Sequence, residues 1–313
     1  MMSTPTAASA PSPTSGTLHP EALLDWYAGA ARDLPWRAAG TSPWAVMVSE
    51  VMLQQTPVAR VLPIWQAWMT RWPDLGDLAK ATPADAVRAW AKLGYPRRAL
   101  RLHAAARKIV TDFGGAVPSS VEELASLPGV GAYTARAVAA FAFGARTPVV
   151  DTNVARVLAR AVSGSPQARQ TVTATDRVMM EALLPLEPTR AALFSVAVME
   201  LGALICIASA PACSACPIRA DCAWQRVGAP AYSGPRRVAQ RFDGTDRQVR
   251  GLLLDVLRSS AVPVAAQDLD LVWDDAQQRS RALGSLLADG MVEDMTDGRF
   301  ALPGEGAPPG RFA

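Results

Sequence analysis

The sequence predicts an all-α main body, a loop that holds a metal centre, and a small C-terminal domain of the winged-helix type. Apolar residues recur at three-to-four spacing through most of the chain, whereas the alternating pattern of strands is essentially absent before residue 290. All four cysteines lie between residues 206 and 222. Half of the 313 residues are apolar, which is enough for a sizeable core and for two domains.

Changes in composition mark the expected domain boundaries. Residues 1–18 are rich in Ser, Thr, Pro and Ala without periodicity, and residues 303–313 are rich in Pro and Gly, so we expect both tails to be disordered. Residues 226–245 have the composition of a linker. The sequence therefore predicts a main domain over residues 19–225 and a small domain over residues 246–302.

The composition also bears on location and partners. The N-terminus has no basic segment followed by an apolar one, and no run of about 18 apolar residues occurs, so we expect neither a signal peptide nor a membrane span. This predicts a cytoplasmic protein. The net charge of +3 is too small to indicate a partner by itself.

Helix start signals recur along the main domain. Ser42 and Thr82 each stand before a proline, a combination typical of an N-cap followed by the first helical residue. Ser120 and Glu123 have the spacing of a capping box. Five segments carry apolar residues at helical spacing: PEALLDWYAGAAR, PWAVMVSEVMLQQ, PVARVLPIWQAWMTRW, PADAVRAWAKL and RALRLHAAARKIVTDF.

The cysteine spacing indicates a metal centre. Cys206, Cys213, Cys216 and Cys222 are separated by six, two and five residues, with no histidine nearby. A zinc site with four cysteines usually has two short knuckles, and only Cys213 and Cys216 form one here. Four thiolates in one compact loop suit a [4Fe–4S] cluster better. Zinc and four buried thiols without a metal remain the alternatives.

A second motif, LPGVG, lies between two helical segments. Pro128 ends the first helix, and Gly129 and Gly131 allow backbone conformations that other residues avoid. The following helix presents free N–H groups to which a phosphate can bind. Such a turn is more often only a tight connection, but basic residues are close in sequence: Arg97, Arg98, Arg101, Arg107 and Lys108.

These motifs together resemble a known family. LPGVGAYTA is similar to the helix–hairpin–helix of the DNA-glycosylase superfamily that includes endonuclease III, and the cysteine loop is similar to its [4Fe–4S] loop. With SEVMLQQT (49–56) and VDTNVARVL (150–158), residues 20–225 resemble the MutY family of adenine DNA glycosylases. The resemblance implies a monomeric bacterial enzyme at the nucleoid. Its implied reaction is excision of adenine mispaired with 8-oxoguanine or guanine in duplex DNA.

Two carboxyl groups are the expected catalytic groups. Glu50 has apolar helical neighbours, a setting that raises the pKa of a carboxyl and suits proton transfer, although an exposed helical Glu is the ordinary alternative. Asp151 opens a helix and is a preferred N-cap, whose hydrogen bonds should keep it ionised. By resemblance, Glu50 is the general acid that protonates adenine N7. Asp151 stabilises the cationic sugar, with Asn153 as its neighbour in the site.

Tyr133 defines the expected subclass. Relatives that also cut the DNA strand carry a lysine at this point of the hairpin, where it forms a Schiff base. Tyr133 cannot form one, so the resemblance implies a monofunctional glycosylase.

The resemblance implies further roles for other positions, each with an ordinary alternative in the core or on the surface. Gln55 and Tyr95 match residues that wedge into the base stack opposite the flipped base, and Gly129 and Gly131 belong to the DNA-binding hairpin. The adenine pocket is expected to include Arg32, Leu34, Trp36, Arg37 and Glu200.

The C-terminal region departs from the family pattern. Members generally carry a Nudix-like domain that reads 8-oxoguanine through a Phe-Ser-His stretch, whereas the only histidines here are His19 and His103. Instead we expect helices over 246–258, 267–273 and 275–288 and a hairpin at Asp297-Gly298. Four arginines of this module either meet DNA phosphates or face solvent: Arg247, Arg250, Arg279 and Arg281.

Two other functions are compatible with parts of the pattern. One is an endonuclease III-like pyrimidine glycosylase with lyase activity, against which Tyr133 argues. The other is a non-catalytic iron–sulfur regulator that binds DNA, against which Glu50 and Asp151 in their matching motifs argue.

Overall fold

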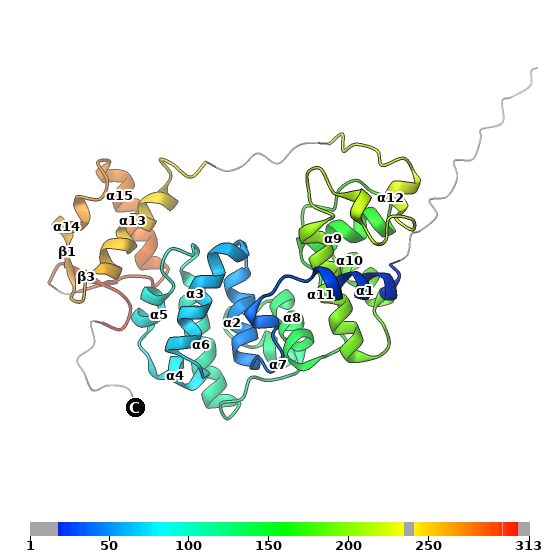
Figure 1. Ribbon diagram of the computed structural model, residues 1–313. Helices are drawn as coiled ribbons and strands as arrows, with labels where there is room; N and C mark the ends of the chain where they lie inside the picture. Colours follow the sequence, from blue (N-terminus) through cyan, green and yellow to red (C-terminus); the bar gives the residue numbers. More distant parts are fainter. Residues whose placement is uncertain (1–17, 235–240, 296, 306–313) are drawn as a thin grey trace, which may run out of the picture. The chain divides into compact units, whose positions relative to one another are not determined.

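The computed structural model describes residues 18–234, 241–295 and 297–305 (Figure 1). The chain is divided into two compact units. The cysteine unit joins Met1–Leu34 to Ala139–Pro235, and the hairpin unit joins Pro35–Val138 to Arg236–Ala313. Each unit therefore draws on two separate stretches of chain. The domain limits expected from composition follow chain order instead, and they remain a prediction.

The hairpin unit is mainly helical, as expected. Ser42 Oγ accepts a hydrogen bond from the backbone N–H of Ala45, and Thr82 forms a full capping box with Asp85, so both predicted helix starts are confirmed. Its helices before the C-terminal module are η1 (Pro35–Arg37), α2 (Pro43–Leu53), α3 (Val58–Arg71), α4 (Leu75–Lys80), α5 (Pro83–Ala89), α6 (Arg97–Asp112), α7 (Val121–Ala125) and the first half of α8 (Ala132–Phe143).

A buried arginine holds two loops of this unit together. The Arg98 side chain, on α6, is only 7% exposed and donates to the carbonyl oxygens of Met52 and Gln54 at the end of α2 and to that of Gly94. It therefore caps the last carbonyl groups of α2. Both loops also contain a non-glycine residue in the left-handed region, since φ is 56° at Gln55 and 48° at Tyr95.

The hairpin between α7 and α8 needs glycine for a steric reason. Gly129 has a φ of 79°, and a Cβ added there would lie 2.7 Å from Cβ of Arg101 on α6. A side chain at this position would therefore force α6 and the hairpin apart.

The cysteine unit packs its helices around a continuous apolar core that includes Leu23, Phe194 and Leu201. Helix α9 continues without a break into a π-helical turn, η2. The elements are α1 (Pro20–Ala30), the second half of α8, α9 (Thr152–Val157), η2 (Leu158–Val162), α10 (Ala174–Leu183), α11 (Pro188–Leu204), η3 (Cys213–Ala215) and α12 (Ala223–Arg226).

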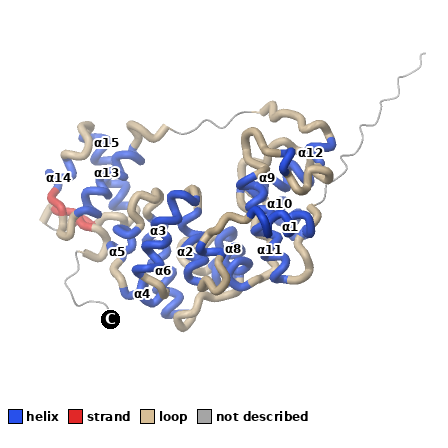
Figure 2. The backbone as a smooth tube through the Cα atoms, viewed as in Figure 1, coloured by secondary structure: helices blue, strands red, loops and turns tan. Residues whose placement is uncertain are grey.

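The C-terminal module has the element order of a winged helix. It consists of α13 (Asp246–Ser259), β1 (Val264–Ala265), α14 (Ala266–Asp270), α15 (Ala276–Ala288), β2 (Glu293–Asp294) and β3 (Arg299–Ala301). The strands form an antiparallel sheet in the order β1-β3-β2, shown in red in Figure 2. The hairpin expected at Asp297-Gly298 is confirmed, since Met295 N–H donates to Arg299 O at 2.7 Å.

Two expectations for this module were wrong in detail. Strand β1 lies before residue 290, where we expected no strand, because two residues are too few to show alternation. The helix expected over 267–273 ends at Asp270. Leu271 remains 84% exposed, so the apolar residues that suggested a longer helix do not all face a core.

The ends of the chain lie partly outside the described residues. The tail expected over 1–18 is described only at Leu18, which is 2% exposed and belongs to the core of the cysteine unit. In the tail expected over 303–313, Glu305 forms an ion pair with Arg88 on α5. No described helix is both long and apolar enough to span a bilayer.

We predict that Arg98→Met destabilises the protein by about 3 kcal/mol or more, since it leaves several buried carbonyl groups without a donor. Arg107→Met, at an exposed position of the same helix, should change stability by about 0.5 kcal/mol or less. Urea unfolding of both variants checks this. Equal midpoints would show that Arg98 does not hold the two loops.

Candidate active site and cysteine pocket

Glu50 lies in a helix that is buried almost all round. Every residue of α2 from Trp44 to Met52 is buried, and Glu50 itself is 6% exposed. A helix that is apolar on every side belongs inside the protein, so a carboxyl within it must also be buried. The alternative of a solvent-facing glutamate is therefore wrong.

Asp151 is the N-cap of α9. Its Oδ1 accepts from the backbone N–H of Val154 at 2.7 Å, and its Oδ2 accepts from Asn153 Nδ2 at 2.9 Å. We expected these bonds to keep the carboxyl ionised. Instead burial, the largest influence, raises the pKa of Asp151 above its ordinary value, although the hydrogen bonds and Arg156 act in the opposite direction.

Arg156 connects this helix start to the cysteine loop. Its Nη2 donates to Asn153 Oδ1 at 2.8 Å and to Gly202 O at 2.6 Å, and its Nε donates to Cys206 O at 2.7 Å. A continuous set of hydrogen bonds thus runs from Asp151 to the first cysteine. Arg156 was not predicted as a site residue, although its position one helical turn after Asn153 places the two side chains on the same helix face.

Gly202 permits this arrangement. A Cβ at Gly202 would lie 2.8 Å from Cβ and 2.9 Å from O of Asn153, so only glycine lets α11 approach α9 at this point. The sequence does not show this requirement, because it depends on two helices that are distant along the chain.

Two of the expected adenine-pocket residues bind each other. Arg32 donates to both carboxylate oxygens of Glu200 at 2.7 Å, and its backbone N–H donates to the same group at 3.0 Å. Glu200 is fully buried, and the hydrogen bond to it is the main cause of the raised pKa of Arg32. Leu34, 6% exposed, belongs to the same unit.

The other two residues expected in the pocket lie in the short helix η1 of the hairpin unit. Trp36 is buried and packs edge-on against Trp65, with ring centroids 5.5 Å apart. Arg37 ends the same turn and is half-buried. The expected pocket set is therefore divided between the two units.

The residues expected to contact DNA all lie in the hairpin unit. Gln55 is exposed and Tyr95 is 51% exposed, and the loops of both are held by Arg98. Tyr133 lies half-buried in the first turn of α8, directly after the turn of Gly129 and Gly131.

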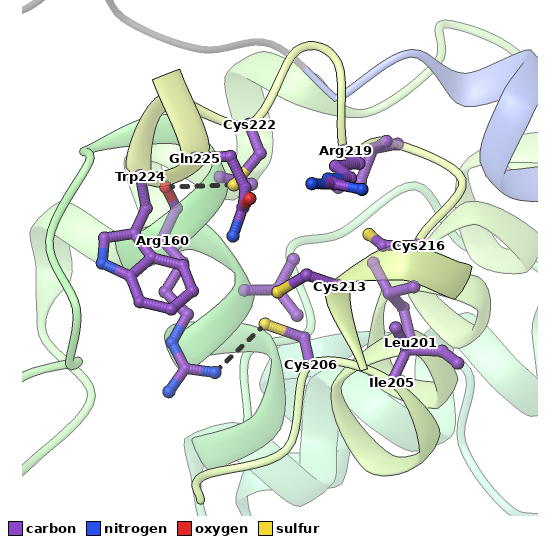
Figure 3. Close-up of a pocket in the computed structure, with 13 residues that line it drawn as sticks. Arg160, Leu201, Ile205, Cys206, Cys213, Cys216, Arg219, Cys222, Trp224 and Gln225 are labelled. Atoms are coloured by element: carbon purple, nitrogen blue, oxygen red, sulfur yellow. Dashed lines mark hydrogen bonds between the residues drawn. The ribbon is translucent and has the colours of Figure 1, made fainter. Parts of the chain in front are cut away.

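The four cysteines line one pocket (Figure 3). They are free thiols, and Arg160 Nη1 lies 3.5 Å from Cys206 Sγ. Burial and the neighbouring thiols raise the pKa of Cys213, and burial raises that of Cys216 to about 11. Within the described residues, no three side chains of ligand type converge on one point as a single ion requires. Four thiols around a common pocket still fit a multinuclear cluster, whose positive charge would favour their ionised form.

Comparisons with known proteins agree with this fold. Residues 48–184 match the model of the HhH-GPD superfamily base excision DNA repair protein. The chain is similar to a thermostable thymine-DNA glycosylase at 27% identity, with a TM-score of 0.60 over 66% of this chain and 95% of that one. It also shares the fold of an endonuclease III in a non-covalent DNA complex, at 22% identity and a TM-score of 0.55 over 68% of this chain and all of that one.

Curated relatives define the family more narrowly. The adenine DNA glycosylase of Mycolicibacterium smegmatis is 56% identical over 93% of this chain and 98% of its own length. That of Mycobacterium tuberculosis is also 56% identical, over 91% of this chain and 93% of its own. The Homo sapiens adenine DNA glycosylase is 45% identical over 66% of this chain and 39% of its length. The chain therefore belongs to the adenine DNA glycosylases, within the helix–hairpin–helix superfamily of base-excision repair proteins.

Proposed function

We propose that this glycosylase hydrolyses the N-glycosidic bond of adenine mispaired with 8-oxoguanine or guanine in duplex DNA, without cutting the strand. The observation that carries the proposal is the burial of Glu50 in the apolar helix α2. Burying a carboxyl costs free energy, and buried carboxyls are enriched at catalytic sites. Its site of action would be the bacterial chromosome in the cytoplasm.

Glu50 acts as the general acid in this scheme. Adenine is a poor leaving group until it is protonated, and a neutral carboxyl can donate a proton to N7 of the extruded base. The same group, once ionised, can accept a proton from the attacking water. Glu50 lies among buried residues of α2, away from bulk water that would otherwise exchange protons with it.

Asp151 stabilises the positive charge that develops on the sugar as the bond breaks. Asn153 Nδ2 and the N–H of Val154 hold its two oxygens in a fixed orientation. Because these donors are already in place, little reorganisation is needed when the cation forms. Burial opposes the ionised form, so the charge of Asp151 is most favourable when the cation is present.

The remaining residues bind the base and the duplex. The bidentate pair of Arg32 with Glu200 supplies a rigid wall for adenine. Gln55 and Tyr95 fill the space that the flipped base leaves. The glycine hairpin between α7 and α8 presents N–H groups to a DNA phosphate.

The cysteine pocket would hold a [4Fe–4S] cluster through Cys206, Cys213, Cys216 and Cys222. When bound, the cluster supplies a rigid cross-link among four points of the loop. The chain's own contribution is the pair of arginines that contact the loop: Arg160 donates to Ile207 O at 2.7 Å, and Arg156 donates to Cys206 O. Loss of the cluster would therefore disturb the same loop carbonyl that anchors Arg156.

A mismatch assay tests the function. End-labelled duplexes with a single A:8-oxoguanine, A:G, A:T or thymine-glycol pair are incubated with the protein, then split into samples with and without alkali. We expect adenine release from the first two, visible only after alkali. Release of the oxidised pyrimidine, or cutting without alkali, would instead support the lyase alternative. Specific binding with no release would support the regulator.

We predict that Glu50→Gln abolishes adenine excision while the affinity for the mismatch stays nearly unchanged. The amide keeps the size of the side chain and can form hydrogen bonds, but it has no acidic proton to transfer, and general acid–base help is worth roughly 10²–10⁴-fold in rate. Single-turnover kinetics and equilibrium binding measure the two effects. Glu122→Gln, at an exposed position of α7, is the control. A near-wild-type rate for Glu50→Gln would contradict the assignment.

Asp151→Asn should lower the excision rate by roughly 100-fold or more, because it removes the charge that faces the sugar cation. Its effect on stability should depend on pH. The raised pKa of Asp151 means that its contribution to stability is present below the unfolded-state pKa and lost as pH rises through the folded-state pKa. Unfolding free energies between pH 4 and 8 should therefore shift in favour of the variant as pH rises. A shift towards the wild type would show that the folded-state pKa is lowered.

If the cysteines hold a [4Fe–4S] cluster, the purified protein should be brown, with broad absorbance at roughly 400 nm and about four iron atoms per chain. Cys213→Ser should lose iron, stability and DNA binding, whereas Ser214→Ala, at an exposed position of the same loop, should retain all three. Iron analysis and thermal unfolding under anaerobic conditions check this. One zinc ion per chain and no iron would exclude the cluster.

A further inference from the structure

The C-terminal module shares its apolar core with helix α5. Ala84 and Val87 of α5 belong to the same buried cluster as Leu253, Leu254 and Leu257 of α13. Ala84 is 1% exposed and Val87 is fully buried. Helix α5 and the module therefore share one apolar core.

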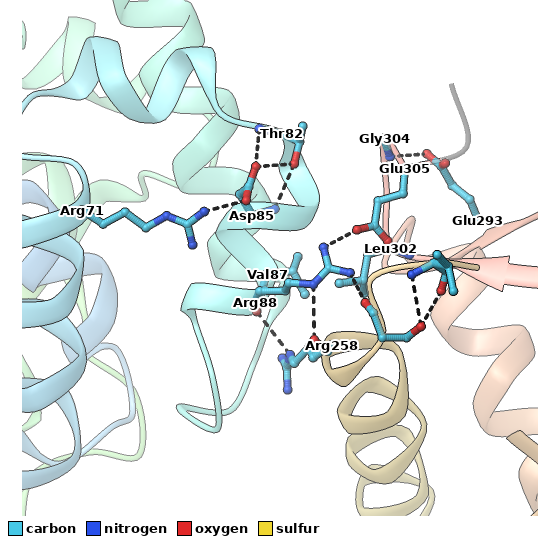
Figure 4. A network of polar contacts seen from close by, with 12 residues as sticks. Arg71, Thr82, Asp85, Val87, Arg88, Arg258, Glu293, Leu302, Gly304 and Glu305 are labelled. Carbon is cyan, nitrogen blue, oxygen red and sulfur yellow. Dashed lines mark hydrogen bonds and ion pairs between the residues drawn. The ribbon is translucent and has the colours of Figure 1, made fainter. Parts of the chain in front are cut away.

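Polar contacts reinforce this packing in both directions (Figure 4). Arg88 on α5 donates through Nη2 to Ser260 O at 2.6 Å and through Nε to Arg258 O at 3.3 Å, and it pairs with Glu305. Arg258 in turn donates to Val87 O at 3.2 Å. Each arginine thus satisfies backbone carbonyl groups at the end of the other's helix, which the helix itself leaves free.

The module also contacts both sides of the loop that carries Tyr95. Asp255 pairs with Lys92 at 3.2 Å, and Asp289 pairs with Arg97 at 3.0 Å. Asp289 is itself held by Arg250 of α13 at 2.6 Å. The module therefore contacts the loop between α5 and α6 at both of its ends through ion pairs, and the buried Arg98 holds the loop from the α2 side.

The charge of the module is unsuited to DNA. Between residues 246 and 305 the chain has eleven carboxylates and six arginines, which gives a formal net charge of −5 in a chain of net charge +3. Three of the four arginines that we expected to meet phosphate or face solvent are paired with carboxylates of the module. The pairs are Arg250 with Asp289, Arg279 with Asp270 at 2.8 Å, and Arg281 with Asp246 at 3.6 Å. The fourth, Arg247, lies over the ring of Phe242.

We propose that the C-terminal module is an internal brace that positions the Tyr95 loop, and that it is not a second DNA-reading domain. This proposal depends on one part of the proposed function, namely that Tyr95 contacts DNA. An acidic body beside the loop would be repelled by phosphate, yet its carboxylates can hold Lys92 and Arg97 in place. Asp289 and Arg88 are then positioning residues, which act on the DNA through the loop.

Arg88→Gln tests the brace, with Arg71→Gln as the matched control. Arg71 pairs with Asp85 of the same helix α5 but not with the module. We expect Arg88→Gln to accelerate hydrogen exchange roughly tenfold in both the module and residues 92–97, since it removes several charge-assisted bonds. Affinity for an A:8-oxoguanine duplex should fall several-fold. The adenosine carries a 2′-fluoro group, which slows bond cleavage, so binding is measured apart from excision.

The salt dependence of binding separates a brace from a DNA contact. A phosphate contact removed from the module would lower the slope of log K against log salt by about 1. We expect Arg247→Gln and Arg281→Gln to leave the slope unchanged. Asp289→Asn should weaken mismatch binding with the slope intact, and it replaces Arg88→Gln if that variant does not fold.

Three results would overturn the brace. The first is an affinity of Arg88→Gln or Asp289→Asn for the mismatch duplex that equals the affinity of Arg71→Gln. The second is unchanged exchange in residues 92–97. The third is a lower salt slope in Arg247→Gln or Arg281→Gln, which would make the module a DNA contact. Hydrogen exchange is measured on the free protein and does not depend on the mispair, so failure of the brace and failure of the adenine assignment remain distinguishable.

Discussion

The guanidinium of Arg156 joins the start of α9 to the loop that carries the cysteines. One planar group satisfies three acceptors, one each from Asn153, Gly202 and Cys206. The fixed fork of an arginine suits this task, whereas a lysine would provide a single point of charge. The orientation of Asn153, and through it of Asp151, therefore depends on a loop fifty residues away in sequence.

Buried charge recurs throughout both units, and each instance has a specific compensation. Glu200 is fully buried and receives three hydrogen bonds from Arg32. Arg98 is held by carbonyl groups, and burial lowers its pKa to about 10. At Asp151, as at Arg98, burial outweighs the hydrogen bonds and disfavours the ionised form. A positive charge close to Asp151 would therefore favour its ionised form.

Local patterns predicted much of the fold. Residues close together in sequence were enough to predict three features. These are the helix starts at Ser42 and Thr82, the position of the four cysteines around one pocket, and the C-terminal hairpin. The arginines that organise the two units were not predicted in their roles. Arg98 and Arg156 bind carbonyl groups about 45 and 50 residues away, and a single sequence does not show which distant backbone groups need a donor.

The sequence indicated which residues could form the candidate site, but not how buried each side chain is or how its pKa is shifted. The apolar neighbours of Glu50 favoured burial but left an exposed glutamate possible. The raised pKa of Asp151 was not predicted, because cap hydrogen bonds can be read from the sequence and desolvation cannot. The acidic character of the C-terminal module was also present in the sequence. The arginines of the module suggested a contact with DNA, but the sequence does not show that Arg250 and Arg281 pair with carboxylates more than 30 residues away.

Gln55 and Tyr95 have a left-handed backbone conformation, which lowers stability at two positions that are proposed to contact DNA. Each residue has a conformation that glycine adopts without strain, and it costs a non-glycine residue of order 1 kcal/mol. Selection for thermal stability alone would favour glycine at both positions. Glycine, however, has no side chain to enter the base stack. Under the proposed function, the side chains of Gln55 and Tyr95 provide the contact with the base stack, so the backbone strain at both positions accompanies a gain that appears only when DNA is bound.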